Sequence, residues 1–352
     1  MISNNKFFIH RANLKLYIYI LFGFIFLLTI GIRAVKGEID FEFYADSETY
    51  IDYVKEIDTI RELLLSNPNL IGPTLILKSL NSNFIAVFLF NALIIIFFFN
   101  QFSRIFKLNR HTFFSYLLVS PMFFSSLITI NKEVLTLLSI TFFFKYYNRK
   151  SFIFLLLSII SAIFVRWQML LFIIALTFLF NKINPFKEMA KLSLILLLVF
   201  VSILYYFNLD QFENFNAIAQ LGQETATEGT GLYNYFINIQ NSSPVGYVFA
   251  FIPKFLFLFI GLIARYSKFL DKAEFYNYTI VFIQSLLNLF TLFKLYRNKI
   301  YFNNIFLFSA IVYCIIFSLS PIYSPRYLFT AYILMAISLS VPEVEVNKKI
   351  KF

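Results

Sequence analysis

Residues 83–110 read NFIAVFLFNALIIIFFFNQFSRIFKLNR. The part 83–100 carries no charge and is close to the ~20 residues that an α-helix needs to cross the hydrocarbon core of a bilayer. The ten residues that follow hold three cations, Arg104, Lys107 and Arg110. Cytoplasmic loops of membrane proteins are enriched in Lys and Arg. The stretch therefore predicts a membrane-spanning helix that ends on the cytoplasmic side.

The same alternation recurs along the whole chain. Eighteen of the thirty Lys and Arg residues fall into six groups of three, which lie between long apolar stretches. The groups are Lys6/Arg11/Lys15, Arg104/Lys107/Arg110, Lys145/Arg149/Lys150, Lys182/Lys187/Lys191, Lys294/Arg297/Lys299 and Lys348/Lys349/Lys351. When each group is placed on the cytoplasmic side, both termini are cytoplasmic.

The composition also indicates a membrane-embedded chain. Hydrophobic residues make up 59% and charged residues 14%, and the mean hydropathy is +0.74, whereas soluble proteins have about 25% charged residues. Only helices and closed barrels satisfy their backbone in lipid, and the apolar runs are longer than the ~10-residue strands of a barrel. We therefore expect an all-α polytopic membrane protein that forms one integral membrane domain over residues 1–352. The net charge of +11 lies mostly in short loops beside the spans, so the expected partner is the lipid bilayer and not nucleic acid.

The apolar stretches predict about ten crossings, with eleven or twelve as the alternative. The expected spans are 14–32, 83–100, 112–130, 134–145, a pair within 151–181, 192–209, 277–293, 302–320 and 328–342. Residues 33–69 and 210–247 are then outer loops, and residues 343–352 form a cytoplasmic tail. The composition of 210–247 is typical of a flexible flap, with a solvated connector as the alternative. Gly72-Pro73 predicts a turn before the second span.

In two regions the length of the apolar stretch does not settle the number of crossings, and the cytoplasmic placement of Lys and Arg groups is needed as well. The stretch 151–181 is short for two spans, but a single span would place the basic group 182–191 outside. We therefore expect two short spans that meet at Arg166. The stretch 248–264 is apolar enough to cross, but a crossing would place the basic group 294–299 outside. We expect a re-entrant or interfacial helix there on the outer side, which is tolerated where such a segment lines a cavity.

Acidic residues gather on the outer side. Of nineteen Asp and Glu residues, only three fall on the cytoplasmic side of this topology. The outer run 43–53, FYADSETYIDY, mixes carboxylates with aromatic rings, and on a helix Asp46 and Tyr50 share a face. Carboxylates accept hydrogen bonds from sugar hydroxyls, and rings stack on sugar C–H faces. Asp46, Glu48 and Tyr50 are therefore candidate site residues, with a solvated acidic loop as the alternative.

Four cations lie where the topology does not require them. Lys132 and Arg326 fall in expected outer turns, and Arg166 and Lys254 lie inside apolar stretches. An ionisable residue within a membrane segment is costly and is by default a candidate functional residue, with snorkelling toward the headgroups as the alternative. Cations that converge on the outer leaflet would bind a pyrophosphate, Arg in bidentate fashion and Lys as a point charge. Glu133, beside Lys132, adds a carboxylate to the same turn.

Motifs for nucleotide, metal or serine-hydrolase chemistry do not occur in the sequence. Its single cysteine, Cys314, excludes an intrachain disulfide, and neither His10 nor His111 has neighbours suited to a metal site. We expect no metal and no cofactor.

Five of these features, taken in order, resemble one family. They are the Asp46-x-Glu48-x-Tyr50 loop followed by Gly72-Pro73, Asn131-Lys132-Glu133, the isolated Arg166, a large outer loop ending in the Pro253-Lys254 helix, and Ser324-Pro325-Arg326-Tyr327. The chain resembles, over nearly its whole length, the Wzy-type O-antigen and capsule repeat-unit polymerases, in particular the EpsG-like subgroup.

The resemblance implies a glycosyltransferase-type polymerase on the outer face of the bacterial inner membrane. Such an enzyme transfers a growing glycan from undecaprenyl pyrophosphate to the terminal sugar of a lipid-linked repeat unit, without metal or nucleotide. A chain-length regulator is a further partner that the resemblance allows. The implied general base is Asp46, Glu48 or Glu133, the pyrophosphate site is Lys132, Arg166, Lys254 and Arg326, and the sugar contacts are Tyr50 and Tyr327.

Two other classes fit parts of the sequence. A polytopic glycosyltransferase that uses a polyprenyl-phosphate sugar donor also carries acids in its first outer loop. A transporter of polysaccharide precursors would place charges through the middle of several spans, whereas here the unexplained cations lie toward one side. Loss of a polymerase leaves a single repeat on the acceptor, and loss of a transferase leaves truncated repeats, so the product separates the two enzymes.

Overall fold

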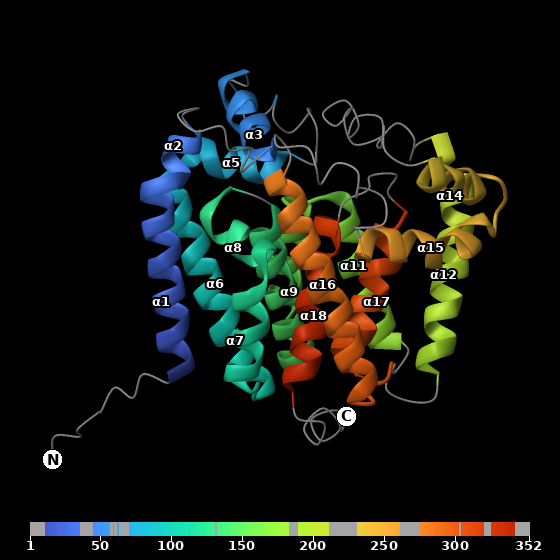
Figure 1. Ribbon diagram of the computed structural model, residues 1–352. Helices are drawn as coiled ribbons and strands as arrows, with labels where there is room; N and C mark the ends of the chain where they lie inside the picture. Colours follow the sequence, from blue (N-terminus) through green and yellow to red (C-terminus); the bar gives the residue numbers. More distant parts are fainter. Residues whose placement is uncertain are drawn as a thin grey trace, which may run out of the picture.

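The computed structural model describes residues 11–35, 45–56, 59, 62, 70–130, 132–182, 189–210, 231–260, 275–302, 304–319 and 325–341. Every regular element in this part of the chain is a helix (Figure 1). The first half contains α1 Arg11–Phe26, η1 Leu27–Gly31, α2 Ile32–Val35, α3 Ala45–Glu56, α5 Ile71–Ser79, α6 Phe84–Phe106, α7 Arg110–Val119, α8 Pro121–Ile128, α9 Lys132–Arg149 and α10 Phe152–Ile163. The second half contains α11 Trp167–Lys182, α12 Ala190–Phe207, α14 Gly231–Asn241, α15 Gly246–Ile260, α16 Phe275–Arg297, α17 Ile305–Phe317, η4 Pro325–Leu328 and α18 Phe329–Ser340.

Several of these helices have the length and composition of membrane spans. Among the described residues, four stretches are long and apolar enough to cross a membrane, and the bent pair α7–α8 adds a fifth if it is one span. The four are 13–31, 84–106, 190–207 and 279–297. The chain is therefore a helical membrane protein, as its composition predicts.

Contacts between helix ends show which elements meet at the lower end of the bundle in Figure 1. The Arg110 guanidinium donates to Asn13 Oδ1 at 3.1 Å, and the backbone N–H of Asn109 donates to the Ser340 carbonyl at 2.8 Å. The ring of Phe306 contacts those of Phe106 and Phe144 at centroid distances of 4.8 and 5.0 Å. The starts of α1, α7 and α17 and the ends of α6, α9 and α18 therefore lie together.

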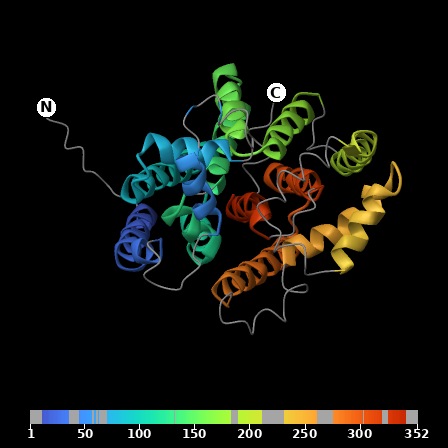
Figure 2. The same cartoon turned by 90° about the horizontal axis from the view of Figure 1, so that it is seen from above.

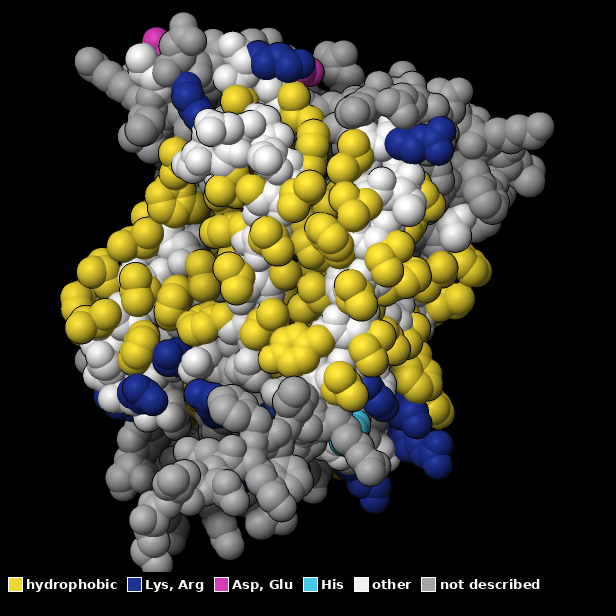
Figure 3. All heavy atoms as spheres, turned by 90° about the vertical axis from the view of Figure 1, so that its left-hand side faces the viewer, with side chains coloured by type: hydrophobic (Ala, Val, Ile, Leu, Met, Phe, Trp, Pro, Cys, Tyr) yellow, Lys and Arg dark blue, Asp and Glu magenta, His cyan; other side chains and the backbone are white. Residues whose placement is uncertain are grey.

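The surface carries the pattern that a bilayer requires. On the face shown in Figure 3, apolar side chains form a broad band, and Lys and Arg side chains lie above and below it, more densely below. On α1, Leu14, Ile18, Leu21 and Ile25 are all exposed. Their helical spacing places these side chains on one face of α1, which suits contact with lipid tails.

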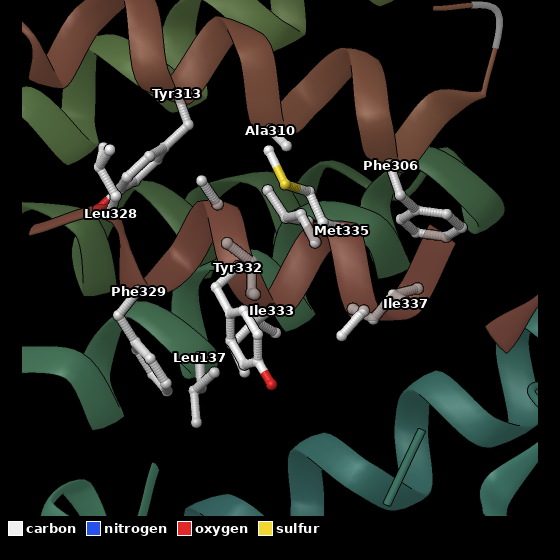
Figure 4. Close-up of a cluster of buried hydrophobic side chains, with 14 of the residues drawn as sticks. Leu137, Phe306, Ala310, Tyr313, Leu328, Phe329, Tyr332, Ile333, Met335 and Ile337 are labelled. Carbon is white, nitrogen blue, oxygen red and sulfur yellow. The ribbon is translucent and has the colours of Figure 1, made fainter. Parts of the chain in front are cut away.

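The α17–α18 pair forms the centre of the bundle. Nearly every residue of both helices is buried, as expected for helices that are apolar all round. Figure 4 shows how Ala310 and Phe306 of α17, Met335 and Ile333 of α18, and Leu137 of α9 fill this centre. The pair is enclosed by α7, α9, α11, α12, α15 and α16.

The predicted span 112–130 is divided into two helices, α7 and α8, that bend by 80°. Ser120 has an extended backbone because the following Pro121 disfavours the helical conformation there. The Ser120 hydroxyl donates to Gln284 Oε1 at 2.8 Å and accepts from the Phe123 amide at 3.2 Å. The bend is therefore built into the fold by a Ser-Pro pair and fixed by a partner on α16.

Two further turn and loop predictions are wrong in part. Gly72 and Pro73 do not form a turn but lie in the first turn of α5, where proline has no amide hydrogen bond to lose. The expected loop 210–247 contains α14, while residues 211–230 lie outside the described part. The tail 343–352 and much of the loop 33–69 also lie outside it.

Two other predictions are met as far as their helices are concerned. The stretch 151–181 is divided into α10 and α11 at residues 164–166, as expected, and a membrane crossing by each of these helices stays a prediction. Over 248–264, α15 extends to Ile260, and residues 261–264 lie outside the described part. Figures 1 and 2 show α15 at the upper end, lying across the bundle direction rather than along it.

Candidate functional site

A buried ion pair links the first turn of α9 to the break between α10 and α11, at the upper end of the bundle. Arg166 Nη2 lies 3.6 Å from Glu133 Oε1. Each residue is only 6% exposed. Charges buried in this way are costly to desolvate and are little screened by salt. The pair is therefore a candidate functional feature and not an ordinary surface contact.

The local fold places both partners. Glu133 lies in the first turn of α9, where the helix dipole favours a negative charge. Arg166 lies in the break between α10 and α11. Its amide donates to the Ala162 carbonyl at 3.1 Å, and its carbonyl accepts from the Met169 amide at 3.0 Å. The backbone of Arg166 is thus held by the helices on both sides of the break.

Two aromatic rings form the walls around the guanidinium. Its central carbon lies 4.5 Å from the ring centroid of Tyr327 and 5.7 Å from that of Phe317. Tyr313 contacts both of these residues. Its hydroxyl donates to the Tyr327 carbonyl at 2.9 Å, and its ring stacks on that of Phe317 with 3.9 Å between the centroids. Figure 4 shows Tyr313 reaching from α17 toward Leu328, the residue after Tyr327. Cation–π contacts of this kind orient a guanidinium without using its N–H groups.

The guanidinium keeps hydrogen-bonding capacity. Within the described part of the chain, Arg166 Nε is buried and has no hydrogen-bond partner. The 3.6 Å separation from Glu133 is also too long for a hydrogen bond. The buried hydroxyl of Ser318, next to Phe317, is likewise unpartnered there. A guanidinium offers five N–H donors in a fixed plane, so this arrangement can donate to the oxygens of a ligand.

Gly72 permits α5 to approach the break that carries Arg166. A Cβ atom on Gly72 would lie 1.9 Å from the Phe164 carbonyl oxygen and 2.8 Å from Leu135 Cδ1. No other residue type fits this contact without moving the backbone. The Gly72-Pro73 motif therefore belongs to the candidate site, although it forms a helix rather than the predicted turn.

Lys132 and Tyr50 lie beside the same turn of α9. Lys132 Nζ is 5.9 Å from the ring centroid of Tyr50. Tyr50 is 1% exposed and packs in a small cluster with Leu77, Val87 and Ile130. It therefore anchors α3 on α5 in this structure, and its predicted contact with a sugar stays a prediction.

Lys254 approaches the segment that follows α17 from the side opposite Arg166. The residue is fully buried, and its Nζ donates to Gln240 Oε1 of α14 at 2.5 Å. Gln240 Nε2 in turn donates to the Leu319 carbonyl at 3.2 Å. Because Leu319 follows Phe317 by two residues, Lys254 and Arg166 flank one short segment, 317–319.

The nine candidate residues are thus brought together in part. Glu133, Arg166 and Tyr327 form one cluster, Lys132 and Tyr50 adjoin it through α9, and Lys254 lies beyond segment 317–319. The backbones of Asp46 and Glu48 are in α3 and that of Arg326 is in η4, beside Tyr327. The side chains of Asp46, Glu48 and Arg326 lie outside what the structure describes.

Sequence reasoning missed Tyr313, Phe317 and Gln240. The first two lie in a run where apolar and aromatic residues are the norm, so their spacing of four residues does not separate them from ordinary core positions. Gln240 lies in a segment expected to be a flap.

Comparison of the chain with family models, curated proteins and solved structures finds no match of any of the three kinds. The function is therefore argued from the geometry of the cluster itself.

Proposed function

We propose that this chain polymerises lipid-linked oligosaccharide repeat units into O-antigen, capsule or exopolysaccharide on the outer face of the bacterial inner membrane. The observation that carries the proposal is the buried Glu133–Arg166 pair, whose guanidinium lies against the Tyr327 ring and keeps an Nε–H that has no partner among the described residues. Glycosyl transfer from a lipid pyrophosphate needs a carboxylate and a cation close together. This pair offers both.

The proposed topology has ten crossings with both termini cytoplasmic. The crossings are α1 with η1, α6, α7–α8, α9, α10, α11, α12, α16, α17 and α18. The basic groups that end α6, α9 and α16 support a cytoplasmic lower end. The upper end, with the ion pair and with α15 as an interfacial or re-entrant helix, then faces outward, where lipid-linked repeat units would be bound.

In the proposed reaction, a hydroxyl oxygen of the terminal sugar on the acceptor attacks the anomeric carbon of the growing glycan. The bond from that carbon to the pyrophosphate oxygen breaks, and its electron pair leaves with the undecaprenyl pyrophosphate. Glu133 takes the hydroxyl proton, with Asp46 and Glu48 of α3 as the other candidates for this role. Arg166 donates to the departing pyrophosphate, and the positive charges of Lys132, Lys254 and Arg326 add to the attraction. Tyr327 stacks on a sugar ring, and no metal or cofactor takes part.

The test is complementation of a strain that lacks this gene. Removal of a group that stabilises charge in a transition state costs about 10²–10³ in rate. We therefore expect Arg166→Gln and Glu133→Gln to leave a single repeat unit on the acceptor in place of a long glycan ladder. Arg166→Lys keeps the charge but loses the planar donor set, so we expect short ladders.

The matched control is Arg104→Gln, which removes an exposed cation at the lower end of the bundle. This variant should give a normal ladder at equal amounts of protein in the membrane. Long ladders from Arg166→Gln would overturn the proposal. Truncated repeat units in place of single complete ones would identify a sugar transferase instead.

A further inference from the structure

The turn between α9 and α10, at the end of the bundle opposite the candidate site, gathers cations around aromatic rings. Lys145 Nζ lies 4.5 Å from the ring centroid of Phe154 and 5.5 Å from that of Phe97. The Arg149 guanidinium carbon lies 5.9 Å from the same Phe154 ring. One ring is thus shared by two cations.

This arrangement brings like charges together. Lys145 and Arg149 are four residues apart on α9, and like charges at this spacing repel and destabilise a helix. In the part of the chain that the structure describes, neither is paired with a carboxylate. Lys145 is partly buried, so the repulsion there is less screened than on an open surface. An anion between the two side chains would turn the repulsion into attraction.

Apolar side chains are exposed next to these cations. Lys150 closes the turn with a left-handed backbone, φ 55°. The first two residues of α10, Phe152 and Ile153, follow at once and are 68% and 66% exposed. Cations and exposed apolar groups within one short turn match a molecule that carries a phosphate and hydrocarbon chains, as phospholipids do at the membrane surface.

We propose that the α9–α10 turn is a binding site for an anionic phospholipid, whose phosphate is held by Lys145 and Arg149. Arg149 contacts the phosphate oxygens through its planar N–H groups, and Lys145 acts as a point charge. Phe152 and Ile153 lie along the start of the acyl chains. This site is independent of the proposed polymerase activity, because it lies at the other end of α9.

The test uses the purified full-length protein in a non-denaturing detergent, with dioleoylphosphatidylglycerol as the probe and native mass spectrometry as the readout. We expect the unmodified protein to retain one phosphatidylglycerol in preference to phosphatidylcholine. The double variant Lys145→Gln/Arg149→Gln should retain at least about tenfold less, since each cation near an anionic headgroup contributes to binding. Phe152→Ser, which leaves every charge in place, should weaken retention to a smaller extent.

The matched control is Lys294→Gln/Arg297→Gln, which removes the same two charges from the last turn of α16. Of that pair, only Lys294 contacts a ring among the described residues, that of Phe290 at 5.3 Å. The control should bind phosphatidylglycerol as the unmodified protein does. Equal losses in the two double variants would show a general charge effect and overturn the site. Equal retention of phosphatidylcholine, or displacement of the lipid by inorganic phosphate alone, would overturn it too.

Discussion

Gly72→Ala should disable the candidate site although it adds a single methyl group. The new Cβ atom would lie 1.9 Å from the Phe164 carbonyl oxygen, whereas Cβ atoms essentially never come within 3.0 Å of another heavy atom. The backbone of α5 or of the break at 164–166 must therefore move by at least about 1.1 Å. Leu135 Cδ1, at 2.8 Å, limits the room for that movement.

Gly72→Ala should reduce both the stability of the protein and the rate of polymerisation. Overpacking of a well-filled interior destabilises by about 1–3 kcal/mol. The larger effect falls on Arg166, two residues beyond Phe164, because a displacement of about 1 Å in a catalytic group can cost ~10²-fold in rate. We therefore expect a loss of glycan polymerisation that is much greater than the loss of folded protein.

The assay measures both quantities in the complemented deletion strain. Glycan ladders report polymerisation, and fluorescence-detected gel filtration of a tagged protein after heating reports stability. The control is Gly31→Ala, whose Cβ would meet only side-chain atoms, Leu27 Cδ1 at 3.0 Å and Ile128 Cγ2 at 3.8 Å. The control should keep a normal ladder. A normal ladder from Gly72→Ala, with unchanged thermal stability, would refute the close approach of α5 to the break.

Three further substitutions test the surroundings of the ion pair. Tyr313→Phe removes the hydrogen bond to the Tyr327 carbonyl. If this bond contributes ~1.4 kcal/mol, the polymerisation rate should fall about tenfold and the ladders should become shorter. Tyr332→Phe is its control, because it removes a similar bond to the Tyr116 carbonyl and should leave activity per molecule unchanged. Gln240→Leu removes the acceptor for Lys254 Nζ and the donor to the Leu319 carbonyl. Limited proteolysis should therefore cut the α14–α15 region faster. An unchanged cleavage rate would contradict the idea that Gln240 links α14 to Lys254 and Leu319. Glu133→Gln alone leaves the buried Arg166 without its carboxylate and should cost about 3–5 kcal/mol of stability, whereas Glu133→Gln/Arg166→Met should recover most of that stability and still give no ladder.

Much of the fold could be predicted because membrane physics constrains the sequence strongly. Apolar length and the Lys and Arg groups predicted α12 and α16 to within four residues at each end, and α6 to within six. The charge rule also predicted the break at Arg166, where length alone favoured a single helix. The bend at Ser120-Pro121 was missed, although Pro121 was a visible signal, because the stretch 112–130 is apolar enough to be interpreted as one span.

The candidate site could be predicted only as a set of residues. An isolated Arg166 in an apolar stretch is conspicuous, and so is Glu133 in a short outer turn. Their pairing depends on how α9 packs against α10 and against the break that follows it, which no local pattern in the sequence states. The same holds for Tyr313 and Phe317, whose role follows from the approach of η4 to α17 rather than from their own neighbours.

The energetics of the ion pair indicate that it contributes little to stability, which favours a functional role. A buried Arg–Glu pair is often no more stabilising than apolar residues of similar volume. Here the guanidinium also leaves Nε without a hydrogen-bond partner in the described part of the chain, and such an unpaired buried donor costs about 1–3 kcal/mol. A core selected only for stability would place apolar side chains between Phe317 and Tyr327, as it does around Tyr332 and Met335. A ligand that supplies oxygens to Arg166 would satisfy this donor and neutralise the charge, and for this reason we propose that the cluster is one half of a binding site.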